Sequence, residues 1–368
     1  MTDGQTFITS ERNEGMASIK GFELKGRAGV GGMGELFFAT RTQSLPGFPA
    51  GQPVVLKWVP NTDHRWLAAL FHELEVLCHF REVNLARLGA LYGVGIAHVQ
   101  PTGVDAEGKW SYLGEGVVEG DDWEEPEPVQ RTFVVLDDIK GTSLKEYIEE
   151  KKGRRLGDRE ASVIALRLSR LLRVLHEDAR TLHNDLKPDN VIIGPGADPF
   201  RVTLIDYGIA IPLNDDLEAG RQPHELAYWG VQEYMSPEKR RGARDTTGTQ
   251  LDWRSELWSL GAVTLGMLGR AEVLRRDPAT IPASLEGIPP PLQAFLSKAL
   301  AASPSERYAS WDQAEEDLRA CSRLLLDAPG AGTHQSFWWN GMAGRIALAA
   351  GAGLALLLAL AEAISLLG

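Results

Sequence analysis

HNDLKPDN, residues 183–190, is the stretch from which the fold of this chain can be predicted. It places an acid, a lysine and an amide at fixed offsets, as Asp185, Lys187 and Asn190. A second acid, Asp206, follows in the segment LIDYG. One acid to orient a nucleophile, with a second acid and an amide to hold magnesium, is the set of groups that phosphoryl transfer needs.

The octet resembles the catalytic loop of Hanks-type protein kinases of the bacterial serine/threonine kind, which usually reads HRDLKPEN. Asn184 replaces the arginine of that pattern and Asp189 replaces the glutamate. The resemblance covers roughly residues 21–326 and implies a bilobal α+β fold with a β-rich N-lobe, a helical C-lobe, and ATP and Mg²⁺ as cofactors. It assigns the role of catalytic base to Asp185 and charge stabilisation to Lys187. Asn190 and Asp206 are the implied metal ligands.

A glycine-rich segment, GVGGMGEL, lies near the start of the chain. Glycine allows backbone amides to approach phosphate oxygens and allows a turn with positive φ. Taken alone the pattern is weak evidence, but a strand with a lysine, VVLK, follows at a suitable distance. In the resemblance, the ATP-binding residues of these two segments are Gly29, Gly31, Gly34, Leu36 and Lys57.

The lysine of this family is held by a glutamate on the next helix, and the candidates are Glu73 and Glu75. REVNLARL, residues 81–88, resembles the HPNIVRL stretch of the family. Counting back from Asn84 favours Glu73, because Glu75 points to another helix face.

The resemblance also assigns residues farther along the chain. Leu136 falls at the gatekeeper position behind the adenine, and Asp137 begins the hinge that binds ATP through its backbone. Glu238, in EYMSPE, is expected to form a buried ion pair with Arg307, in SPSERY. That pair would support the lower lobe and would take no part in the chemistry.

Three residues depart from the family pattern. Asn184 cannot supply the positive charge that normally receives a phosphorylated activation loop. Val231 stands where most members have a threonine that bonds the catalytic acid and lysine. Glu256 replaces an aspartate, and its longer side chain is expected to disturb slightly the hydrogen bonds that support the catalytic loop. The departures at Asn184 and Val231 leave phosphate chemistry available and weaken the case for a protein serine or threonine as acceptor.

Residue patterns predict where the strands and helices lie. A strand-rich first part and a helix-rich second part predict an α+β protein in two lobes. The acid- and proline-rich stretch 116–129 is expected to be a solvated loop. The predicted strands are 52–60, 131–139, 191–193 and 202–205, and the predicted helices are 66–80, 143–150, 160–178, 257–268 and 313–326.

Composition excludes some classes of function. The formal net charge is −12 and no basic stripe is visible, which argues against a nucleic-acid partner. Cys78 and Cys321 lie in no metal-ligand pattern and are expected to be reduced thiols. Residues 1–20 are polar and lack the apolar core of a signal peptide, so we expect a disordered lead-in.

The C-terminal segment 337–368 is predicted to be a transmembrane helix. Residues 346–361 carry no charge, and an aromatic cluster with Arg345 precedes them. The alternative is a hydrophobic helix packed on the globular part or in a soluble oligomer. Small residues recur every four positions, which is compatible with a homodimer.

We therefore expect a kinase-like domain at 21–327 (N-lobe 21–137, C-lobe 141–327), a linker at 328–336, and one C-terminal span that anchors a cytoplasmic kinase domain to the cell membrane. The expected activity is ATP- and magnesium-dependent phosphoryl transfer to protein hydroxyl groups. The alternatives are a pseudokinase scaffold and a kinase with a small-molecule acceptor. Neither the protein substrate nor the activating signal follows from the sequence.

Overall fold

The computed structural model describes most of the first 326 residues and divides the chain into two compact units, Met1–Arg319 and Ala320–Gly368. The described residues are 18–31, 34–60, 64–86, 89, 94–104, 109–118, 129–150, 155–194, 201–213, 229–242, 251–275 and 281–326.

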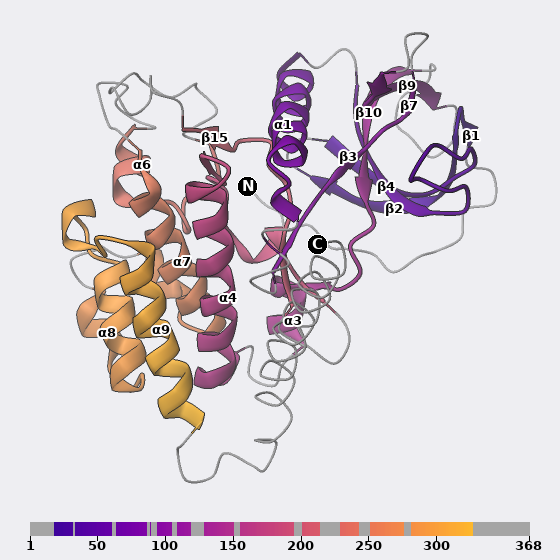
Figure 1. Cartoon of the computed structure of the whole chain (residues 1–368). Coiled ribbons are helices and arrows are strands. Elements are labelled where there is room, and N and C mark those ends of the chain that lie inside the picture. Colours follow the sequence, from indigo (N-terminus) through magenta and orange to yellow (C-terminus); the bar gives the residue numbers. More distant parts are fainter. Residues whose placement is uncertain are drawn as a thin grey trace, which may run out of the picture. The chain divides into compact units, whose positions relative to one another are not determined.

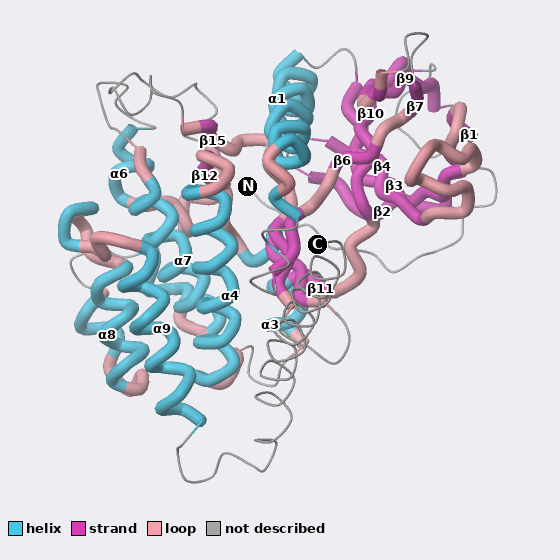
Figure 2. Tube along the Cα trace, viewed as in Figure 1, coloured by secondary structure: helices cyan, strands magenta, loops and turns pink. Residues whose placement is uncertain are grey.

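The N-terminal part of the first unit is built on one antiparallel sheet (Figures 1 and 2). Its order is β1-β2-β3-β4-β10-β6, and β9 also pairs with β10. Alternate residues of β4, Val54, Leu56 and Trp58, are buried on one face, where Trp58 stacks on Phe133 of β10. The strands are β1 (Ser18–Ile19), β2 (Phe22–Gly31), β3 (Gly34–Arg41), β4 (Pro53–Pro60), β6 (Val99–Gln100), β9 (Leu113–Val118) and β10 (Val129–Asp137).

Helix α1 (His64–Glu82) packs against β4 and β10 of this sheet. It buries Leu70, Glu73, Val76, Leu77 and Phe80, a spacing of three and four residues that marks one helix face. Because β4 alternates, Lys57 points away from the face that carries Leu56 and Trp58. The helix and the strand therefore bring Glu73 to Lys57.

The rest of the first unit is mainly helical. Helices α4 and α7 pack together, and α8 packs on α7. The polar loop of residues 183–190 follows α4 and is continued by short strands that pair with each other. The helices are α3 (Leu144–Glu149), α4 (Asp158–Glu177), α6 (Pro237–Gly242), α7 (Trp253–Met267), α8 (Pro290–Ala299) and α9 (Trp311–Leu326). The 3-10 turns within the described residues include η1 (Pro188–Asn190), η3 (Ala271–Arg275), η5 (Pro282–Leu285) and η6 (Pro304–Glu306).

The remaining short strands of the first unit form small sheets. In one of them, β5 pairs in parallel with β14 and joins the order β11-β13-β14-β5. The short strands are β5 (Val94–Ile96), β7 (Gly103–Val104), β8 (Trp110–Ser111), β11 (Thr142–Ser143), β12 (Thr181–Leu182), β13 (Val191–Ile193), β14 (Val202–Leu204) and β15 (Ile211–Pro212).

The two-lobed α+β architecture is confirmed, and the main predicted strands and helices are present with shifted ends. The loop predicted at 116–129 is wrong at both ends, because Val118 of β9 pairs with Val129 of β10. The backbone pairing of β9 with β10 thus extends into both ends of the stretch whose acids and prolines predict a loop. The predicted lead-in 1–20 also overlaps β1, where Ile19 is buried.

Among the described residues, no helix combines the length and the apolar character that a membrane crossing requires. The predicted linker 328–336 and span 337–368 lie outside the described residues.

Candidate active site

The glycine-rich segment forms the end of β2 and the start of β3, with Gly31 paired to Gly34. Gly34 has φ +134°, and a Cβ atom there would lie 2.6 Å from the carbonyl oxygen of Trp58. A side chain at this position would collide with the backbone of β4. Gly34 therefore has a structural reason to be glycine that is independent of any ligand. Gly29 lies opposite Leu36 in the two strands, and Leu36 in turn lies opposite Lys57.

Lys57 is the centre of a buried ion cluster. Its Nζ donates to Glu73 Oε2 at 2.6 Å and to Asp206 Oδ1 at 2.9 Å. Glu75, the other candidate partner, is exposed. Three segments far apart in sequence thus meet at one ammonium group, and the pairing expected of Glu73 is present.

The charges of this cluster stabilise one another. Burial alone would lower the pKa of Lys57, but the carboxylates of Asp206 and Glu73 raise its pKa above the ordinary value. For Asp206, burial acts to raise the pKa, but the charge and hydrogen bond of Lys57, together with the charge of Lys187, lower that pKa to about 2. Both groups are therefore charged at neutral pH.

Helix α1 is also bonded to the segment that follows Asp206. Glu73 Oε1 accepts a hydrogen bond from the backbone N–H of Tyr207 at 3.2 Å. The ring of Tyr207 is fully buried between Phe80 of α1 and His183, at 4.9 Å from each ring centroid. These contacts hold Asp206 and Glu73 in one arrangement.

The predicted catalytic residues converge on Asp185. One of its oxygens, Oδ2, accepts from Lys187 Nζ at 2.6 Å and from Asn190 Nδ2 at 3.0 Å. The amide of Asn190 also donates to the backbone carbonyl of Asp185. The other oxygen, Oδ1, is the one that an acceptor hydroxyl would approach.

His183 and Asn184 shape the backbone that presents Asp185. His183 Nε2 lies 3.0 Å from the carbonyl oxygen of Ile205, and its Nδ1 accepts the backbone N–H of Asp185. Burial lowers the pKa of His183 to about 4, so the ring is neutral at physiological pH. Asn184 has φ +66°, a conformation that asparagine adopts more readily than most residues. Its side-chain amide donates to the carbonyl of Ile209 at 2.9 Å.

Glu256, at the start of α7, supports the same turn. Its Oε1 accepts the backbone N–H of Asn184 at 2.9 Å. That bond has ordinary length, but Glu256 Oε2 is buried and makes no hydrogen bond within the described part of the chain. The expected disturbance of the loop by the extra methylene therefore stays a prediction. Burial raises the pKa of Glu256 to about 7. Asn184 therefore departs from the family pattern and still holds the loop through hydrogen bonds to two distant segments.

The predicted hinge begins at the end of β10. Asp137 is the last residue of that strand, and its backbone N–H donates to the carbonyl of His98 at 3.1 Å. Its carboxylate accepts from Gln100 Nε2 at 2.6 Å. Leu136 is half-buried between Val55 of β4 and Val99 of β6.

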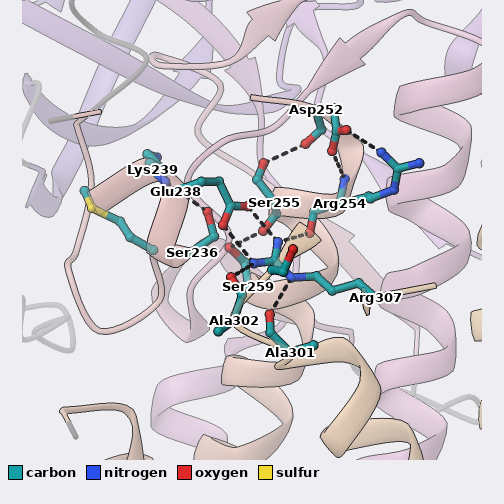
Figure 3. Close-up of polar contacts among 12 residues, drawn as sticks. Ser236, Glu238, Lys239, Asp252, Arg254, Ser255, Ser259, Ala301, Ala302 and Arg307 are labelled. Atoms are coloured by element: carbon teal, nitrogen blue, oxygen red, sulfur yellow. Dashed lines mark hydrogen bonds and ion pairs between the residues drawn. The ribbon is translucent and has the colours of Figure 1, made fainter. Parts of the chain in front are cut away.

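Glu238 and Arg307 form the expected ion pair, which is buried (Figure 3). Arg307 Nη1 and Nη2 donate to Glu238 Oε1 and Oε2 at 2.6 and 2.8 Å, a bidentate geometry. The guanidinium also donates to the carbonyls of Ala301 and Arg254 at 2.9 and 2.8 Å. The pair ties α6 to α7 and to the turn before α9.

The residues suit a magnesium ion that shares its coordination with a nucleotide. Among the described residues, no group of three His, Cys, Asp and Glu side chains could hold a metal without other ligands. Magnesium is commonly held by one or two protein oxygens together with substrate phosphates. Asp206 is ionised and its side chain is 31% exposed. Asn190 lies beside Asp206, because the backbone carbonyl of Asn190 accepts a hydrogen bond at 3.0 Å from the backbone N–H of Ile205, the residue before Asp206.

Comparison with known proteins agrees with this geometry. The protein kinase domain family matches residues 117–317, more than half of the 368 residues. A probable serine/threonine-protein kinase of Thermomonospora curvata, PkwA, is 28% identical over 83% of this chain and 33% of its own length. The serine/threonine-protein kinase PknB of Mycobacterium tuberculosis is 29% identical over 50% of this chain and 30% of its own length.

The matched region thus spans about a third of these bacterial relatives. The solved structure of vaccinia related kinase 3 aligns with 88% of this chain and with 94% of its own chain, at a TM-score of 0.57. At 20% identity this likeness concerns the fold alone.

Proposed function

Because the chain belongs to the protein kinase domain family, with relatives among the Hanks-type bacterial serine/threonine kinases, we propose that it transfers the γ-phosphate of ATP to a protein hydroxyl group. The observation that carries the proposal is the convergence of Lys57, Glu73 and Asp206 in one ion cluster. The catalytic loop supplies the second half of the site, around Asp185.

Each residue has a role that follows from its contacts. Asp185 Oδ1 accepts the hydrogen of the acceptor hydroxyl and orients its oxygen for attack. Lys187, already at Asp185 Oδ2, lies where negative charge develops on the transferring group. Lys57 contacts the phosphates and is held in place by Glu73. Asn190 and Asp206 would hold magnesium, which when bound neutralises phosphate charge.

Two alternatives remain distinct from this proposal. A pseudokinase scaffold would have no need for the intact set of polar residues, all of which are present and connected. A small-molecule kinase would have no need for the segment that ends in Glu238, whose pair with Arg307 favours a protein acceptor. Assaying the purified protein with γ-labelled ATP on generic protein acceptors and on small alcohols separates the three.

Activity should be independent of phosphorylation on serine or threonine of the activation loop. Residues 206–235 contain no serine and no threonine, and Asn184 stands in place of the arginine that usually binds the phosphate of the activation loop. We expect phosphatase-treated protein to keep its rate of transfer, with mass spectrometry of residues 206–238 as the check on treatment. A large loss of activity that follows the removal of a phosphate from this segment would contradict the prediction.

We also propose that residues 337–368 attach the chain to the cell membrane, with the kinase domain on the cytoplasmic side, and that the span allows self-association. The support is the uncharged run 346–361. Full-length protein should remain in the membrane fraction after a high-salt wash, whereas a chain ending at Ala328 should be released. Full-length protein that stays soluble without detergent would remove the proposal.

A further inference from the structure

Lys239 is a buried lysine for which the catalytic residues described above leave no role. It lies in α6 directly after Glu238 and is only 4% exposed. Lysine is almost never fully buried without a partner, because removing its charge from water is costly. Its ammonium donates a hydrogen bond to the backbone carbonyl of Asn184, in the catalytic loop.

The bond completes the set of contacts that fixes Asn184. The backbone N–H of this residue is held by Glu256, and its side-chain amide is held by the carbonyl of Ile209. Lys239 takes the backbone carbonyl. The backbone N–H, the backbone carbonyl and the side-chain NH2 group of this residue at φ +66° are therefore all engaged, and the next residue along the chain is Asp185.

Gly230 shows that Lys239 also borders the carboxylate of Asp185. A Cβ atom built on Gly230 would lie 3.1 Å from Asp185 Oδ1 and 3.4 Å from Lys239 Nζ. The ammonium is thus near the oxygen that is left for the acceptor, while Lys187 and Asn190 engage the other oxygen.

The charges around Lys239 are consistent with a working cation. Burial lowers the pKa of Lys239 to about 8, and the neighbouring carboxylates of Asp185 and Glu256 oppose that fall, while Lys187 adds to it. The lysine is therefore largely protonated at pH 7.

We propose that Lys239 is a positioning residue whose fixed positive charge orders the turn at Asn184 and Asp185, in place of a phosphorylated activation loop. The proposal rests on the proposed kinase activity. In this chain the end of the activation segment reaches the catalytic loop directly, through the hydrogen bond from the ammonium group of Lys239 to the carbonyl of Asn184. A phosphate group is then not needed to connect the activation segment to the catalytic loop.

The test compares three replacements of Lys239 in the full-length protein. Lys239→Met keeps the length of the side chain and removes both the charge and the hydrogen bond, so kcat should fall about 10- to 100-fold. The Kd for ATP should change less than about threefold, because Lys239 makes no contact with Lys57 or Asp206. Lys239→Gln can keep the hydrogen bond without the charge and should remain impaired, whereas Lys239→Arg should recover part of kcat.

Lys298→Met serves as the matched control, because this exposed lysine of α8 lies over the ring of Tyr308 and away from the catalytic loop. Its kcat should be unchanged. A Lys239→Met protein with wild-type kcat would overturn the proposal, as would equal losses of kcat, ATP affinity and thermal stability. A Lys239→Gln protein with full activity would show that charge is not required and would overturn it too. A wild-type protein without transfer would overturn the proposed function together with this inference.

Discussion

Asp185→Asn should abolish measurable phosphoryl transfer and leave ATP affinity nearly intact. The substitution keeps the shape of the side chain but removes the charge that accepts the hydroxyl hydrogen. Loss of a general base lowers the rate by about 10²- to 10⁴-fold. The nucleotide contacts expected at Lys57 and Asp206 do not pass through Asp185. Transfer from γ-labelled ATP measures the first effect, and a fluorescent-nucleotide titration measures the second.

Asp189→Asn is the control, since it makes the same chemical change four residues along the same loop. The carboxylate of Asp189 accepts from Lys145 at 3.1 Å, and its charge is only the smallest of the contributions that raise the pKa of Lys187. The Asp189→Asn protein should keep its transfer rate within about threefold of the wild type, because a partly exposed ion pair contributes little. Asp206→Asn should differ from both by weakening magnesium-dependent ATP binding. An Asp185→Asn protein with wild-type transfer would exclude this residue as the base.

Arg307→Met should cause the largest loss of stability of any single change considered. The side chain of Arg307 is fully buried, and that of Glu238 is 5% exposed. Removing the arginine leaves the Glu238 carboxylate buried without its partner, which costs about 3–5 kcal/mol of the free energy of unfolding. Urea denaturation followed by tryptophan fluorescence measures the change, since Trp258 lies 5.3 Å from the guanidinium.

Two further variants identify the cause of that loss. Arg155→Met removes an exposed arginine from a surface pair and should change stability by less than about 0.5 kcal/mol. Adding Glu238→Met to Arg307→Met should recover part of the loss, because no unpaired charge then remains buried. A loss of less than about 1 kcal/mol for Arg307→Met would contradict the role given to this pair.

Local spacing was sufficient to predict much of the site. Asp185, Lys187 and Asn190 lie within one loop, so their offsets alone bring them together. The partner of Lys57 followed from the resemblance to the kinase pattern together with helix geometry, because counting back from Asn84 favours Glu73 and Glu75 points to another helix face. These contacts depend on short stretches of regular backbone.

Contacts that depend on long-range folding were not predicted. The roles of Asn184 and Lys239 require the turn at φ +66° and the placement of α6 against the catalytic loop. These two residues are 55 positions apart, and no periodic pattern connects them. The pairing of β9 with β10 was missed for a related reason, because acids and prolines between two strands look like one continuous loop. In each case a tertiary contact outweighed local composition.

The most direct test of the account is whether the purified full-length protein transfers phosphate. The protein would be incubated with γ-labelled ATP and magnesium, alone and with generic protein acceptors, beside Asp185→Asn. The account predicts label on protein hydroxyl groups that requires magnesium and is absent from the variant. A wild-type protein that carries no label, and that binds a partner protein equally well with and without ATP, would contradict it and favour the pseudokinase scaffold.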